Sequence, residues 1–185
     1  RVSLVGSEMC IRDRVVTVRA IKTPEELAHF EEINRRSSRA IAQTIRWVRD
    51  MIGQGERITE LGYYEQANRF YAEEGARDLS FHTIAAVGAN SAIIHFSDPH
   101  DDVVAGRDDL MLLDSGAYYE AGFCTDITRT FIAGGAAANP TARQKEVYTL
   151  VLKGVLQGMM SVFPEGTKGT FCLLYTSPSP RDSLE

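Results

Sequence analysis

Two aspartates in otherwise apolar or β-branched segments are the residues of this sequence best suited to chemistry. Asp114 lies in the segment 110–116 and Asp126 in the segment 125–130. Strand interiors disfavour aspartate and an isolated buried carboxylate is costly, so two of them on paired strands need a cation, a hydrogen-bond network or protonation. Hard divalent cations, which prefer carboxylate oxygens, supply the missing positive charge.

A second interpretation gives both aspartates structural roles. In this interpretation Asp114 caps a turn at Ser115-Gly116, and Asp126 forms an ion pair with Arg129. The residue types alone do not separate this interpretation from a metal site.

Paired strands are the elements expected to position the two carboxylates. Short apolar runs punctuated by Gly, Asn, Asp and Pro predict strands over residues 81–87, 92–96, 110–118 and 123–132. Glu120-Ala121-Gly122 separates the last two runs and predicts a glycine-containing turn. Asp114 and Asp126 are therefore expected on the two strands of an antiparallel hairpin.

Three helices are expected to pack around these strands. The first starts with the cap sequence Thr23-Pro24 and runs to about Met51, and the second covers about 59–74. The third starts with Asn139 as N-cap and runs to about residue 162. Together the elements predict an α+β fold with long helices packed on an antiparallel-rich sheet.

The two ends of the sequence read as translated sequencing adapter. Residues 4–13 and 172–182 back-translate into DNA strings of which one contains the reverse complement of the other, as at the two ends of a transposase-based library insert. We therefore expect residues 1–14 and 172–185 to be adapter-derived, with the biological insert between them at 15–171. The insert need not end at a domain boundary.

Composition excludes several functional classes. The net charge is -5, and the expected adapter segments carry as many basic as acidic residues, so the insert has the same charge. This acidic balance does not indicate a nucleic-acid binder, and no apolar run reaches the length of a membrane span. Only one of the three cysteines, Cys124, lies in the insert, which excludes a disulfide framework and favours a reducing, cytoplasmic setting.

Four ordered motifs resemble the catalytic domain of the Xaa-Pro aminopeptidases, the aminopeptidase P group of the pita-bread metallopeptidases. They are DLSFHTIAAVGANSAIIHFS (78–97), LLDSGA (112–117), TDITRTF (125–131), and VLKG followed by VFPEGTKG (151–154 and 162–169). The resemblance covers nearly the whole insert and implies the N-terminal half of a pita-bread catalytic domain.

The resemblance implies a site for two divalent metal ions, most often Mn²⁺. Asp114 matches one aspartate ligand, Asp126 matches the ligand that bridges both ions, and His95 matches a histidine that hydrogen-bonds the substrate or the reacting centre. The aspartates are twelve residues apart, one more than is usual in the family. If the extra residue shifted the strand register, one carboxylate would point away from the metals.

The function expected from the resemblance is removal of an N-terminal residue that precedes proline, by a parent protein that is a homo-oligomer. The family's other ligands, a histidine and two glutamates, come from a half that this chain lacks, so the chain alone is expected to be inactive. A prolidase-type Xaa-Pro dipeptidase is the nearest alternative. A non-catalytic binding protein on the same fold is a further alternative, which the presence of both Asp114 and Asp126 disfavours.

Overall fold

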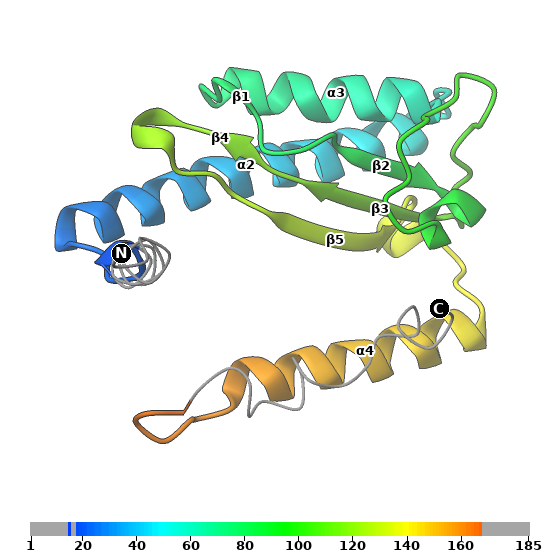
Figure 1. Ribbon diagram of the computed structural model, residues 1–185. Coiled ribbons are helices and arrows are strands. Elements are labelled where there is room, and N and C mark those ends of the chain that lie inside the picture. Colours follow the sequence, from blue (N-terminus) through cyan, green and yellow to red (C-terminus); the bar gives the residue numbers. More distant parts are fainter. Residues whose placement is uncertain (1–14, 16–17, 168–185) are drawn as a thin grey trace, which may run out of the picture. The chain divides into compact units, whose positions relative to one another are not determined.

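The computed structural model describes residue 15 and residues 18–167 (Figure 1). Both expected adapter segments, 1–14 and 172–185, lie outside the described residues. The chain divides into two compact units, residues 1–138 and 139–185. The first contains helices α2 and α3 and all the named strands, and the second contains helix α4.

The first unit contains two long helices, as the sequence predicts. Helix α2 spans Pro24–Gln54, and Thr23 and Glu26 form a capping box at its start. Its C-cap is Gly55, which has a φ of 77°, a left-handed conformation that glycine adopts without steric cost. Helix α3 spans Glu60–Glu73, and the hydroxyl of its N-cap Thr59 accepts a bond from the Gly62 amide.

The main sheet has three antiparallel strands in the order β2-β3-β5. Strand β2 is Ile84–Val87, β3 is Leu110–Ser115 and β5 is Ile127–Ile132. A smaller sheet pairs β1, Asp78–Leu79, with β4, Ala117–Tyr118. The expected α+β architecture with an antiparallel sheet is confirmed.

The two faces of the main sheet differ in burial. Helices α2 and α3 cover one face (Figure 1), where Ala85, Met111, Leu113 and Phe131 join the helical side chains in the main hydrophobic core. Alternation along each strand turns Ile84, Leu112 and Asp114 to the other face. Part of that face is covered by Phe96, which packs with Ile84, Ala86 and Leu112.

The strand predicted over residues 92–96 is wrong. A short 3-10 helix, Gly88–Ala92, occupies this part of the chain and is followed by irregular backbone. The amide of Ile93 donates to the Asn90 carbonyl and the amide of Phe96 to the Ile93 carbonyl, so these amides are satisfied locally. Ile93 and Ile94 are exposed, and among the described residues no strand pairs with this run, so its apolar composition does not lead to a strand.

The second unit contains α4, Ala142–Met160. The sequence places the N-cap at Asn139, whereas the structure places it at Thr141, whose hydroxyl accepts the Gln144 amide while the Gln144 side chain accepts the Thr141 amide. This reciprocal pair satisfies two amides at the helix start, which an Asn139 cap followed by Pro140 does not. Among the described residues, no helix is long and apolar enough to cross a membrane.

Candidate metal centre

The hairpin of β3 and β5 keeps one register along its whole length. Asp114 is opposite Thr128 and Ser115 is opposite Ile127, and the same register continues to the bridge between Tyr118 and Cys124. Side chains alternate between faces, so residues 114, 126 and 128 share one face of the hairpin. The additional residue between the aspartates therefore does not place the two carboxylates on opposite faces of the hairpin.

A tight turn closes the hairpin at Glu120–Gly122. The Tyr119 amide donates to the Phe123 carbonyl at 3.0 Å across its base. Ala121 and Gly122 have φ values of 59° and 77°, the left-handed conformation that tight hairpin turns use. The turn predicted at these residues is confirmed.

Asp114 is held by the neighbouring strand rather than by a turn. The Thr128 hydroxyl donates to Asp114 Oδ1 at 2.8 Å, and Asp114 lies inside β3, paired with Ile84 and Thr128. Arg129 is on the opposite face from Asp126, and its guanidinium donates to the Thr128 carbonyl at 2.7 Å. The geometry therefore contradicts the interpretation in which Asp114 caps a turn and Asp126 pairs with Arg129.

His95 and Asp114 line the same small pocket. The pocket has a volume of about 200 Å³ and lies between the sheet and the segment that follows β2; its lining is Ile84, Ser91, Ala92, Ile93, Ile94, His95, Leu112 and Asp114. Asp126 does not belong to this lining, but alternation puts it on the same face. The structure thus brings together an imidazole and a carboxylate that are nineteen residues apart in sequence.

The donor chemistry at this face fits a hard divalent cation, although the ligand set is small. Asp114 is half-buried and Asp126 is exposed, so their oxygens are accessible to an ion. Two carboxylates supply anionic oxygen ligands, which Mn²⁺ and Mg²⁺ accept. In the described part of the chain, no group of three or more His, Cys, Asp or Glu residues is arranged to hold a metal. A complete dinuclear site needs further ligands.

The opposite face of the hairpin is fixed by buried hydroxyl groups. The hydroxyl of Tyr71, on α3, lies 3.0 Å from Ser115 Oγ, next to Asp114. Ser37 Oγ, on α2, lies 2.7 Å from Thr125 Oγ1, next to Asp126. Asp114 and Asp126 are therefore each the direct sequence neighbour of a residue that is hydrogen-bonded to a helix.

Burial raises the pKa of Tyr71 to about 12, and the negative charges of Asp114 and Asp126 add to the shift, while the bond to Ser115 opposes it. The phenol therefore stays neutral at physiological pH and can serve as a hydrogen-bond partner. Neither Tyr71 nor Ser37 is among the functional residues predicted from the sequence. The available signal was a serine on the apolar side of α2, between Ile33 and Ile41.

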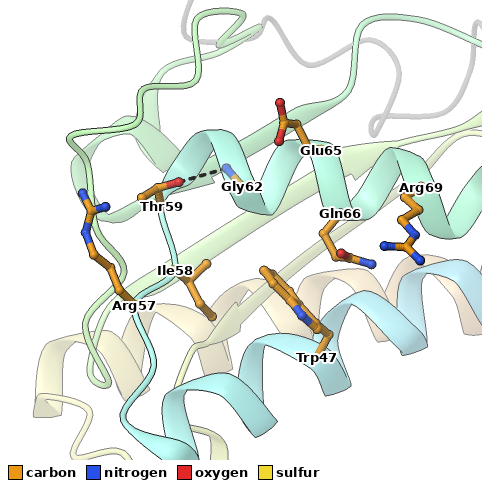
Figure 2. A pocket seen from close by; sticks show the side chains of 8 residues that line it. All are labelled: Trp47, Arg57, Ile58, Thr59, Gly62, Glu65, Gln66 and Arg69. Carbon is orange, nitrogen blue, oxygen red and sulfur yellow. Dashed lines mark hydrogen bonds between the residues drawn. The ribbon is translucent and has the colours of Figure 1, made fainter.

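A second pocket lies between α2 and α3 and has a volume of about 380 Å³ (Figure 2). Its lining is Trp47, Arg57, Ile58, Thr59, Gly62, Glu65, Gln66 and Arg69. Two guanidinium groups accompany its one carboxylate, a charge balance that disfavours a divalent cation. The carboxylate face of the hairpin is therefore the better candidate metal centre.

Curated relatives match most of this chain. It is 34% identical over 161 residues to a probable Xaa-Pro aminopeptidase P of Coprinopsis cinerea, covering 86% of this chain and 25% of the relative. It is 35% identical over 157 residues to Xaa-Pro aminopeptidase ApepP of Drosophila melanogaster, covering 84% of this chain and 25% of the relative. The chain thus spans about a quarter of the length of these relatives.

Solved structures show the same fold and the same partial coverage. The X-prolyl aminopeptidase of Caenorhabditis elegans, described as a cytosolic enzyme with a di-nuclear active site, superposes with a TM-score of 0.76 at 30% identity, covering 83% of this chain and 25% of that one. Prolidase from Pyrococcus furiosus superposes with a TM-score of 0.69 at 28% identity, covering 82% and 41%.

The residues that match a family model include the hairpin, the His95 segment, most of α2 and all of α3 and α4. The model of metallopeptidase family M24 matches residues 28–172, which is most of the chain and includes both aspartates. Its position agrees with the pita-bread fold expected from the four sequence motifs. The chain therefore belongs to metallopeptidase family M24.

Proposed function

We propose that this chain is the N-terminal half of a catalytic domain whose complete form hydrolyses the peptide bond between an N-terminal residue and a following proline. The observation that carries the proposal is the placement of Asp114 and Asp126 on one face of the hairpin, with His95 and Asp114 lining one pocket. The relatives named Xaa-Pro aminopeptidase support the substrate class.

Asp126 is proposed to bridge two divalent ions, most often Mn²⁺, and Asp114 to bind one of them. Two ions bound there would activate a water molecule and polarise the scissile carbonyl. The remaining ligands, a histidine and two glutamates, would come from the second half of the domain. The Thr128 hydroxyl would orient Asp114, because it already donates to one of that carboxylate's oxygens.

His95 is proposed to hydrogen-bond the substrate at the edge of the metal site. Its imidazole is exposed and lines the pocket beside Asp114, so it can reach a peptide without a rearrangement of the sheet. A peptide with proline at the second position is the proposed partner. We further propose a cytoplasmic homo-oligomer, with residues 1–14 and 172–185 derived from sequencing adapters rather than from the gene.

Three variants of the complete protein test this function. Asp126→Ala should abolish Xaa-Pro cleavage and lower the metal content, and Asp114→Ala should do nearly the same. His95→Ala should keep the metal and lose turnover, because its proposed partner is the substrate. Metal analysis beside cleavage of an Xaa-Pro peptide gives both readouts. If Asp126→Ala kept its metal and its activity, the proposed ligand set would be wrong.

A prolidase-type dipeptidase is the second candidate. The likeness to the Pyrococcus prolidase favours it, since the two chains share this half of the fold. Comparing cleavage of an Xaa-Pro dipeptide with cleavage of a longer peptide that starts with the same two residues separates the candidates. Cleavage of the longer peptide supports the aminopeptidase, and cleavage of the dipeptide alone supports the dipeptidase.

A further inference from the structure

The segment that carries His95 has a backbone that needs external support. It follows β2 and includes a non-glycine residue in the left-handed region, His95, with a φ of 57°. A residue with a Cβ rarely adopts this conformation unless its surroundings impose it. Phe96 is the buried contact next to His95, and it fixes one point of the segment against the sheet.

One buried carboxylate is hydrogen-bonded to both ends of this segment. Glu60, in the first turn of α3, is fully buried. Its Oε1 accepts the Val87 amide at 2.8 Å, and both of its oxygens accept the Asn90 side-chain amide at 3.1 Å. Its Oε2 accepts the His100 amide at 3.2 Å. Residues before and after His95 are thus bound to the same side chain.

The backbone around Glu60 strengthens the same connection. The Glu60 amide donates to the Val103 carbonyl at 2.9 Å, and the Leu61 amide donates to the His100 carbonyl at 3.1 Å. The first turn of α3 is therefore joined to the segment through main-chain bonds as well as through the carboxylate.

We infer that Glu60 is a positioning residue that holds the segment from Val87 to His100 in the conformation that presents His95 to the pocket beside Asp114. A carboxylate suits this role because its two oxygens accept every donor that faces them, and all of these donors are neutral. Burying that negative charge is costly. The four hydrogen bonds and the partial positive charge at the N-terminus of α3 offset the cost. The inference rests on the role proposed for His95.

The variant Glu60→Gln tests the role of the carboxylate's hydrogen bonds with almost no change in side-chain shape. In Glu60→Gln one acceptor oxygen becomes an amide donor, which then faces the Asn90 amide together with either the Val87 N–H or the His100 N–H. One end of the segment should therefore be released while α3 stays folded. Asn90→Ala is the complementary variant, because it removes one donor and leaves Val87 and His100 bound.

The control variants separate positioning from general stability. Glu65→Gln makes the same chemical change at an exposed position of the same helix. Val48→Ala removes buried methyl groups from α2, away from the segment, and should lower the melting temperature. Neither control should alter the pocket that His95 and Asp114 line.

The test measures steady-state kinetics, metal content and the NMR signal of the His95 ring in the complete protein. Glu60→Gln and Asn90→Ala should lower kcat/KM by about tenfold to a hundredfold with the metal retained, as expected for a misplaced substrate contact. The His95 ring signal should shift or broaden in both variants, and amide exchange at Val87 or at His100 should accelerate in Glu60→Gln. Both controls should leave the ring signal and kcat/KM unchanged, Val48→Ala despite its lower melting temperature.

Two results would overturn the inference. One is an unchanged His95 ring signal and unchanged kcat/KM in both variants. The other is a loss of metal in Glu60→Gln that accounts for its loss of activity. A wild-type protein that does not cleave Xaa-Pro peptides would refute the proposed function instead, and the ring signal and the amide exchange would still decide whether Glu60 positions His95.

Discussion

Replacing Gly116 by alanine should disrupt the hairpin at the point where the two carboxylates are aligned. Gly116 follows Asp114 by two residues and lies across the strand pair from Asp126 in the register. A Cβ added at Gly116 would lie 1.9 Å from the Thr125 carbonyl oxygen and 2.7 Å from its carbon. A carbon and an oxygen that are not bonded approach to about 3.3 Å, so the strands would have to separate by about 1.4 Å.

The surrounding hydrogen bonds resist this separation. The Thr125 amide donates to the Ala117 carbonyl at 3.0 Å, and Ser80 Oγ donates to the Thr125 carbonyl at 2.8 Å. Overpacking a rigid site costs about 1 to 3 kcal/mol, and each lost bond adds about 1 kcal/mol. We therefore expect Gly116→Ala to lower the free energy of unfolding by about 3 to 5 kcal/mol.

Urea unfolding of the complete protein, followed by circular dichroism, measures this loss. Gly53→Ala is the matched control, because Gly53 lies inside α2 and a Cβ there meets no atom within 4 Å. The control should be neutral or stabilising by up to about 1 kcal/mol. Mn²⁺ affinity should fall in Gly116→Ala and not in the control. A Gly116→Ala protein as stable as the control, with unchanged Mn²⁺ affinity, would refute the reasoning.

Three further predictions follow from the site and its surroundings. Thr128→Val should weaken Mn²⁺ binding by about tenfold to a hundredfold, because it removes the donor to Asp114, whereas Thr130→Val, an exposed position on the same strand, should not; a metal titration of both variants checks this. Burial raises the pKa of Tyr71 from 10.0 to about 12. The stabilisation that protonated Tyr71 contributes is therefore complete below pH 10 and is lost as the pH rises from 10 to 12. Tyr71→Phe should make the urea unfolding midpoint fall less steeply over this pH range. The chain by itself should bind at most one Mn²⁺ weakly and should aggregate, because apolar residues of α4 are exposed; calorimetry and light scattering test this, and a cooperative monomeric transition would contradict it.

The sequence was sufficient for the elements that local chemistry determines. The helix start at Thr23-Pro24, the turn at Glu120–Gly122 and the hairpin strands all follow from short-range patterns, and the structure confirms them. The common face of Asp114 and Asp126 also follows, once the register is known to be unbroken.

Features that depend on long-range contacts could not be read from the sequence. The run 92–96 has the composition of a strand, but no neighbouring strand pairs with it among the described residues. The burial of Glu60 depends on donors that lie 27 to 40 residues away, and no local pattern indicates them. The bond between Ser37 and Thr125 likewise joins residues 88 positions apart.

Anomalous X-ray diffraction at the manganese edge, on crystals of the complete protein grown with Mn²⁺, tests the central claim most directly. The account predicts two manganese peaks at the hairpin, with the Asp126 carboxylate in contact with both and the Asp114 carboxylate in contact with one. His95 should lie beside the peaks without binding either. Manganese at another place in the protein, or no peak in contact with the two carboxylates, would contradict the account.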